Sequence, residues 1–162
     1  MPDTIETGAR DPATGSKENA VTIPDELRGA TDFHTHLGPF LVVGLRMGAV
    51  VTRELGSEPF SIHIVAHTGR RPPYSCVLDG IQFSTPCTIG NGGLEVGDDR
   101  LMAIDAAAHG RRVTAALRDD VLWRIENECT KESQERFACE LWTLPEEELL
   151  HVTVVTEERE SR

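Results

Sequence analysis

The sequence predicts an α+β fold, a single domain in which helices pack against a mixed, largely antiparallel sheet. Three observations lead to this prediction. A long apolar run at helical spacing follows Pro39, two alternating segments joined at His109-Gly110 predict a β-hairpin, and residues 151–156 predict a last strand. The order of elements is helix, strand, short helix, strands, helices, strand, which favours α+β. A chain of 162 residues has the size of one domain with one hydrophobic core.

The chain begins with a polar segment, residues 1–22, that is rich in Gly, Pro, Ser, Thr and charge and has no hydrophobic period. Such a segment cannot bury enough apolar surface to offset its conformational entropy, so we expect a disordered or loosely attached arm. Residues 23–162 then form the domain. A short helical turn is expected at residues 24–29, and a pair of histidines follows it.

The first long helix is expected to begin at Pro39 and to end at Gly56, because proline suits a first helical position and glycine suits a helix end. Its residues are apolar on most sides, which predicts a mostly buried helix. Gly44 and Gly48 lie four residues apart and leave a smooth patch, where another backbone can approach closely.

The middle of the chain predicts a strand and then a short helix. Residues 60–68 alternate between apolar and polar, as a strand does. Ser75 is placed to cap a short helix over residues 76–84, and Pro86 ends that helix because it disfavours helical backbone at Thr85. A glycine-rich loop follows.

The last third of the chain is expected to be mainly helical before the final strand. A helical region is expected from Asp119 to about Leu144, and residues 145–150 predict one more helical turn.

The charge balance excludes some partners. The 16 basic and 27 acidic residues give a net charge of −11, which is the wrong sign for binding a phosphate backbone, so we expect no nucleic acid partner. Only Lys17 and Lys131 are lysines. An acidic, lysine-poor composition favours a salt-rich cytoplasm, as in a halophilic archaeon, over the alternative of codon bias. We expect a cytoplasmic protein that does not enter a membrane, because no segment resembles a signal peptide or a membrane span.

Four cysteines in such a chain predict metal binding or thiol chemistry, because the cytosol keeps thiols reduced. Cys129 and Cys139 lie in a charged, helical segment with no histidine nearby, and we interpret them as packing residues. Cys76 and Cys87 are the better candidates.

Two histidines and these two cysteines predict a metal site. His34 and His36 would point to one side of an extended segment, because successive side chains of such a segment alternate between its faces. Cys76 and Cys87 flank the short helix and could supply thiolates, and a mixed set of imidazole and thiolate ligands suits a transition metal, with zinc the best fit. Cys76 would also sit in the first helical turn, where the helix dipole lowers a thiol pKa.

Three polar residues are candidates for orienting ligands or substrate. Asp79, Gln82 and Thr85 are spaced three apart and would share one helix face. The competing imidazoles, His63 and His67, lie four apart on the predicted strand with no carboxylate or thiol placed to help them. We interpret these two as surface or dimer-contact residues.

Three motifs together resemble the E-subunit family of formylmethanofuran dehydrogenase. They are "DFHTHLGPFLVVGLRMG", "PPYSCVLDGIQFSTPCTIGNGG" and "LPEEELLHVTVV", and the resemblance covers roughly residues 27 to 156. It implies an α+β domain, a homodimer and a metal site in a cleft. His34, His36, Cys76 and Cys87 would then inherit the ligand positions, with Asp79, Gln82 and Thr85 beside them.

The chain also departs from the family pattern. Pro86, Asn91 and Gly93 replace the glycine, lysine and asparagine that the family often has, and Gly38 stands where many members have a cysteine. The C-terminal zinc ribbon of many members is absent, so the sequence looks like the core domain alone.

Three functional hypotheses follow. The first is a metal-binding protein of one-carbon metabolism, in which three protein ligands plus a water would make the site catalytic in form and four ligands would make it structural. In the catalytic form His36 binds the metal and His34 serves as a general acid or base. The second is a non-catalytic accessory or regulatory subunit of a larger oxidoreductase. The third is a thiol-redox protein that uses Cys76 and Cys87.

Overall fold

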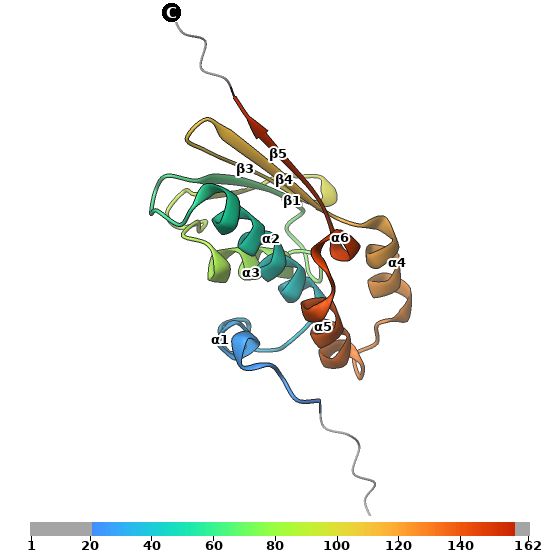
Figure 1. Ribbon diagram of the computed structural model, residues 1–162. Helices are drawn as coiled ribbons and strands as arrows, with labels where there is room; N and C mark the ends of the chain where they lie inside the picture. Colours follow the sequence, from blue (N-terminus) through green and yellow to red (C-terminus); the bar gives the residue numbers. More distant parts are fainter. Residues whose placement is uncertain (1–20, 158–162) are drawn as a thin grey trace, which may run out of the picture.

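The computed structural model describes residues 21–157 (Figure 1), so all but two residues of the expected arm lie outside the described part of the chain. The described residues form six helices and a five-stranded sheet. In chain order they are α1 (Asp25–His34), α2 (Pro39–Leu55), β1 (His63–Thr68), α3 (Cys76–Ser84), β2 (Leu94–Val96), β3 (Arg100–Ala108), β4 (Arg111–Leu117), α4 (Asp119–Glu128), α5 (Gln134–Thr143), α6 (Glu146–Leu149) and β5 (Leu150–Thr156).

The sheet has the strand order β2-β1-β3-β4-β5. Strands β1 and β2 are parallel and every other neighbouring pair is antiparallel, so the predicted α+β fold with a mixed, largely antiparallel sheet is confirmed. The predicted hairpin is β3–β4. Its turn is made at His109 and Gly110, which both have positive φ, of 52° and 72°, as a two-residue hairpin turn requires.

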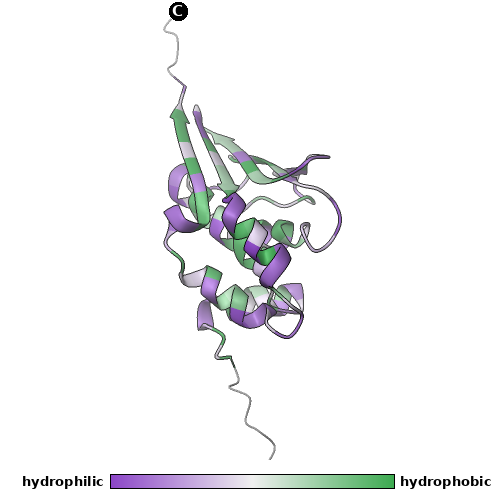
Figure 2. Ribbon diagram, turned by 90° about the vertical axis from the view of Figure 1, so that its right-hand side faces the viewer, coloured by the Kyte–Doolittle hydropathy of each residue, from purple (hydrophilic) through white to green (hydrophobic). Residues whose placement is uncertain are grey.

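Helix α2 lies at the centre of the molecule and packs against one face of the sheet, and α3 runs beside it (Figure 1). The sheet residues that face these helices, such as Ile64, Ile104 and Val113, are fully buried. In Figure 2 hydrophobic residues gather along the strands and the helices next to them, whereas the outer turns are hydrophilic. The expectation that α2 is mostly buried is confirmed.

Two glycines allow α2 and α3 to touch backbone to backbone. A Cβ added to Gly44 would collide with the carbonyl oxygen of Val77 in α3, and one added to Gly80 would collide with the α2 backbone at Leu41 and Leu45. The predicted close approach at Gly44 is thus confirmed. This contact fixes α3, which carries candidate site residues, on the long central helix.

The expected helical region from Asp119 to Leu144 is two helices rather than one. Between α4 and α5, the backbone N–H of Thr130 donates to the side-chain oxygen of Ser133 at 2.9 Å, and such local side-chain bonds compete with helix continuation. Arg46 of α2 then holds the end of α5, because its Nη1 donates to the carbonyl oxygens of Leu141, Trp142 and Leu144 at 3.1, 2.9 and 2.8 Å.

Two other local predictions are corrected. The turn expected at residues 24–29 continues as a ten-residue helix, α1, whose buried Leu27 and Ala30 give it a packed side. Ser75 makes no capping hydrogen bond and has helical backbone angles itself, so the predicted cap is wrong. Thr85 is extended, as expected for the residue before Pro86.

Within residues 21–157 no single helix is long and apolar enough to cross a membrane. Helices α1 and α2 meet the length and composition test only as a pair, and they are bent by 115° at the break between them.

Candidate functional site

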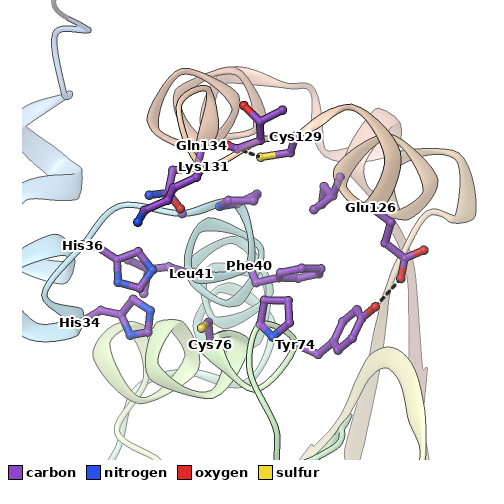
Figure 3. Close-up of a pocket in the computed structure, with 15 residues that line it drawn as sticks. His34, His36, Phe40, Leu41, Tyr74, Cys76, Glu126, Cys129, Lys131 and Gln134 are labelled. Carbon is purple, nitrogen blue, oxygen red and sulfur yellow. Dashed lines mark hydrogen bonds between the residues drawn. The ribbon is translucent and has the colours of Figure 1, made fainter.

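A pocket lies between the N-terminal end of α2, the approach to α3 and the α4–α5 connection (Figure 3). Its volume is about 560 Å³, within the range of small-molecule sites. The pocket is lined by His34, His36, Gly38, Pro39, Phe40, Leu41, Pro73, Tyr74, Cys76, Ile125, Glu126, Cys129, Thr130, Lys131 and Gln134.

His34 and His36 reach this pocket together, but not because residues 34–36 are extended. His34 is the last residue of α1, and Thr35 has a left-handed backbone (φ 74°) that ends the helix. This reversal brings the two imidazole rings to a centroid separation of 4.5 Å. The predicted shared direction is therefore correct and the predicted cause is wrong.

His34 is the more enclosed of the two imidazoles. Its side chain is 9% exposed, and its Nδ1 lies 2.6 Å from Oδ2 of Asp79 on α3. In the tautomer that donates from Nδ1 to this carboxylate, the lone pair of the ring is on Nε2. Nε2 is buried and has no hydrogen-bond partner among the described residues.

Cys76 lines the same pocket from the first turn of α3. Burial raises the pKa of its thiol, and the nearby Asp79 carboxylate raises that pKa further. The expected lowering by the helix dipole is therefore wrong for this site, because desolvation and a like-charged neighbour outweigh it. Cys76 is a neutral thiol here, and it would ionise most readily beside a cation.

Cys87 does not join the pocket. It is 2% exposed in the hydrophobic core, where its Sγ donates to the carbonyl oxygen of Ile62 at 3.4 Å. Thr85 lies extended after α3, and Cys87 beyond it contacts Ile62 just before β1, so the two ends of the short helix lie in different environments. The expectation that one cleft receives both Cys76 and Cys87 is corrected. All four cysteines are free thiols. The thiol-redox hypothesis required Cys76 and Cys87 to lie in one site, and they do not.

The other candidate residues, on α3 and just after it, do not line the pocket. Asp79 touches His34, and Gln82 supports it by donating from Nε2 to Oδ1 of Asp79 at 3.3 Å. Gln82 also accepts from the backbone N–H of Ile89 through Oε1. Thr85 donates to the carbonyl oxygen of Ile81 and accepts from the backbone N–H of Cys87, so it shapes the loop.

Sequence reasoning missed the whole α4–α5 side of the pocket, including Glu126, Cys129, Lys131 and Gln134 (Figure 3). These residues lie some ninety positions after the histidine pair, and no local motif connects the two regions. The interpretation of Cys129 as a packing residue alone is incomplete, because it also lines the pocket beside the helix break.

The competing imidazoles on β1 do have carboxylate partners. His63 Nε2 lies 3.1 Å from Glu95, and His67 lies between Asp99 at 2.9 Å and Asp105 at 3.0 Å. The expectation that no carboxylate helps them is wrong, because β2 and β3 flank β1 and bring acids from later in the chain.

The chemistry available in the pocket is that of imidazole and thiol donors without a preformed cage. Within residues 21–157 no three or more His, Cys, Asp or Glu side chains are grouped closely enough to hold a metal ion. The donor types that do line the pocket, nitrogen from His34 and His36 and sulfur from Cys76, are those that zinc and similar ions prefer.

Fold and site together define a small α+β protein with an open pocket whose walls carry two imidazoles and a thiol. The chain belongs to the family described as "FmdE, Molybdenum formylmethanofuran dehydrogenase operon", whose model matches residues 33–151. The matched segment contains the histidine pair and α3, which confirms the resemblance seen in the sequence.

Two known proteins show how far the similarity reaches. A tungsten formylmethanofuran dehydrogenase FmdE-like protein from Syntrophus aciditrophicus matches with a TM-score of 0.61 and 20% identity, over 83% of this chain and 72% of that one. At that identity the match shows the fold. A probable S-adenosyl-L-methionine-binding protein from Archaeoglobus fulgidus is 34% identical over 67 residues, which make up 40% of this chain and 18% of that protein. The chain therefore spans less than a fifth of that relative's length.

Proposed function

We propose that this chain is a metal-binding protein that holds one transition metal ion, zinc by preference, in the pocket through His34, His36 and Cys76. One observation carries the proposal: Nε2 of His34 is buried and has no partner among the described residues. A buried polar atom without a partner costs about 1–3 kcal/mol, and a ligand that accepts its lone pair would recover that cost.

The Asp79–His34 pair supports a ligand role for His34 rather than the acid/base role expected for it. A carboxylate that accepts from one ring nitrogen orients the imidazole and makes the other nitrogen more basic, as carboxylates behind zinc-binding histidines do. The carboxylate of Asp79 thus presents Nε2 as a donor atom.

His36 and Cys76 would complete the set, and their side chains would have to rotate to do so, because the described side chains form no group of three ligands as they stand. His36 is exposed and Cys76 is partly buried, and both line the pocket next to His34. Three protein donors leave one position of a tetrahedral ion for a substrate, which is the pattern of catalytic zinc sites. An ion bound in this way would act as a Lewis acid on a substrate oxygen.

Metal content tests the proposal. Protein purified without added metal should contain about one equivalent of zinc or a similar ion by elemental analysis, and His34→Ala or Cys76→Ala should lose most of it. Cys139→Ala, which lies outside the pocket, and Cys87→Ala should keep it. Thermal midpoints identify variants that fail to fold. Full metal content in folded His34→Ala and Cys76→Ala would refute the site.

The second candidate is an accessory subunit of a larger oxidoreductase, and one surface observation favours it. Phe33 of α1 and Phe83 of α3 are 55% and 45% exposed, with ring centroids 6.1 Å apart, and two such phenyl rings side by side are typical of a contact surface. If this function is the correct one, Phe33→Ser with Phe83→Ser should abolish co-purification with the enzyme and leave metal content unchanged.

We also propose a homodimer located in the cytoplasm. One face of the sheet packs against the helices, and no described helix covers the other face (Figure 1). The uncovered face includes small side chains such as Ala103, Ala107 and Ala116, which suits contact with a second copy. Sedimentation should give twice the chain mass.

A further inference from the structure

The side of the pocket where His36 lies carries one side chain that the proposed metal site does not use. Lys131, in the α4–α5 connection, is the only lysine or arginine among the residues that line the pocket, and Figure 3 draws it with Gln134 next to His36. It is also one of only two lysines in the sequence, whose net charge is −11.

Lys131 has no ion-pair partner among the described residues, although Glu132 follows it in the sequence and Glu126 lines the same pocket. Most arginines of the described chain are paired, for example Arg53 with Glu146 at 2.6 Å and Arg124 with Glu140 at 2.6 Å. Two carboxylates at the site have other partners. Glu126 accepts from the hydroxyl of Tyr74 at 2.7 Å, and Asp79 is bound to His34. The ammonium group is therefore available to a ligand.

The floor of the pocket is apolar. Phe40, Leu41 and Ile125 are all at most 5% exposed overall and still line it, so they present apolar surface to a ligand while remaining part of the core. The pocket thus offers an apolar floor and, on the side where His36 lies, a cation and an amide, within about 560 Å³. A few polar groups on an apolar site are what fix the orientation of a small ligand.

We infer that the pocket takes a small organic acid with an apolar body, and that Lys131 selects it by its carboxylate. The ammonium group of Lys131 binds the carboxylate, and the side-chain amide of Gln134 donates a second hydrogen bond to it. The body of the acid lies on Phe40 and Ile125. This arrangement places the carboxylate of the acid on the side of the pocket where His36 lies. Neither the carboxylate contact nor the apolar contact requires the metal of the proposed function.

Benzoate and benzamide test the inference, because they share a shape and differ in charge. Calorimetric titration of the zinc-loaded full chain should show benzoate binding at least about tenfold more tightly than benzamide, since a charge-assisted hydrogen bond exceeds a neutral one by roughly that factor. Lys131→Met should remove this preference, and Lys131→Arg should restore most of it.

Arg136→Met is the matched control. Arg136 is an exposed residue of α5 that does not line the pocket, so its replacement changes the net charge equally and should leave benzoate affinity unchanged. An equal loss of benzoate affinity in Lys131→Met and Arg136→Met would show that only the net charge matters, and it would overturn the inference. Equal affinity for benzoate and benzamide, or no benzoate binding up to about 10 mM, would also overturn the inference.

The same titration without metal separates the two proposals. If elemental analysis finds no metal and benzoate still binds in a Lys131-dependent way, the metal site fails and the acid site stands. If zinc binds through His34 and Cys76 while Lys131→Met keeps full benzoate affinity, the acid site fails and the metal site stands.

Discussion

Asp79 determines which ring nitrogen of His34 faces a ligand in the pocket. Its carboxylate lies 2.6 Å from Nδ1, so the ring cannot turn Nδ1 toward a ligand without losing a charge-assisted hydrogen bond. The pair also joins the last residue of α1 to α3, two elements that the sequence separates by some forty residues.

Asp79→Asn should weaken zinc binding by about 10–100-fold without unfolding the protein, because the amide is a poorer acceptor and holds the ring orientation less firmly. Competition with a coloured chelator measures the affinity. Asp32→Asn is the control, since Asp32 is an exposed acid of α1 outside the pocket. A loss of equal size in the control would assign the effect to net charge alone.

Residue types predict part of the site, and the tertiary fold decides the rest. His34, His36 and Cys76 are expected to face one cleft and do line one pocket. The assignment of Cys87 rests on its place at the end of the short helix, on a turn expected at Pro86 and on the family resemblance. No sequence rule shows that the chain enters the core there instead. Lys131 is equally invisible in the sequence, because its position depends on how α5 docks on α2.

At the scale of elements, the contact between α2 and α3 holds the site in place. Helix α3 carries both Cys76 and Asp79, and it lies on α2 through Gly44 and Gly80, where any Cβ would meet backbone atoms. Backbone atoms cannot move aside as a flexible side chain can, so the contact tolerates no larger residue.

Gly44→Leu should lower the free energy of unfolding by about 1–3 kcal/mol or more, because the new side chain has to push the two helices apart. Urea denaturation measures the change. Ala49→Leu on the exposed side of the same helix should change it by less than about 0.5 kcal/mol. An unchanged midpoint for Gly44→Leu would mean that the helices do not touch there.

His67 ties the β2–β3 connection to the sheet by contacting Asp99 and Asp105. Its hydrogen bond with Asp99 raises the pKa of His67, and the same bond lowers the pKa of Asp99. Because the pKa is raised, the imidazolium stabilises the folded chain. This stabilisation is fully present at pH values below the unfolded-state pKa near 6.5, and it is lost as the pH rises through the folded-state pKa. The pKa of Asp99 is lowered, so the contribution of this carboxylate to stability is lost as the pH falls through the folded-state pKa.

His67→Gln should therefore lower the thermal midpoint most between about pH 5 and 6.5 and have little effect well above that range. Thermal unfolding of both proteins across the pH series tests the sign. A difference that grows toward alkaline pH would contradict the ion-pair account.

The secondary structure is predicted well where the pattern is long or strongly alternating. Helix α2, the β3–β4 hairpin and β5 all lie where the sequence places them. Predictions fail where a few local bonds decide the backbone, as at Thr130 and Ser133 between α4 and α5, or where packing extends a helix, as in α1.

At the scale of the whole molecule, the net charge of −11 opposes compaction. The described surface is not purely repulsive, since it includes pairs such as Arg53–Glu146, which joins α2 to α6, and Arg124–Glu140, which joins α4 to α5. Exposed pairs of this kind each contribute little to stability, whereas the repulsion among the unpaired acids accumulates over the surface.

Raising KCl from about 0.1 M to about 1 M should therefore raise the thermal midpoint, because screening removes more repulsion than attraction. A differential scanning series in KCl measures it. A midpoint that falls with salt would show that the ion pairs dominate, and it would remove the support for a salt-rich cytoplasm.

The most direct measurement of the central claim is X-ray absorption at the zinc edge of the metal-loaded protein. Our account predicts zinc bound by two imidazole nitrogens at about 2.0–2.1 Å and one sulfur at about 2.3 Å, the remaining position holding a light atom. It also predicts that Cys76→Ala removes the sulfur and that Cys87→Ala does not. Coordination by two sulfurs, or by oxygen alone, would contradict the assignment of the ion to His34, His36 and Cys76.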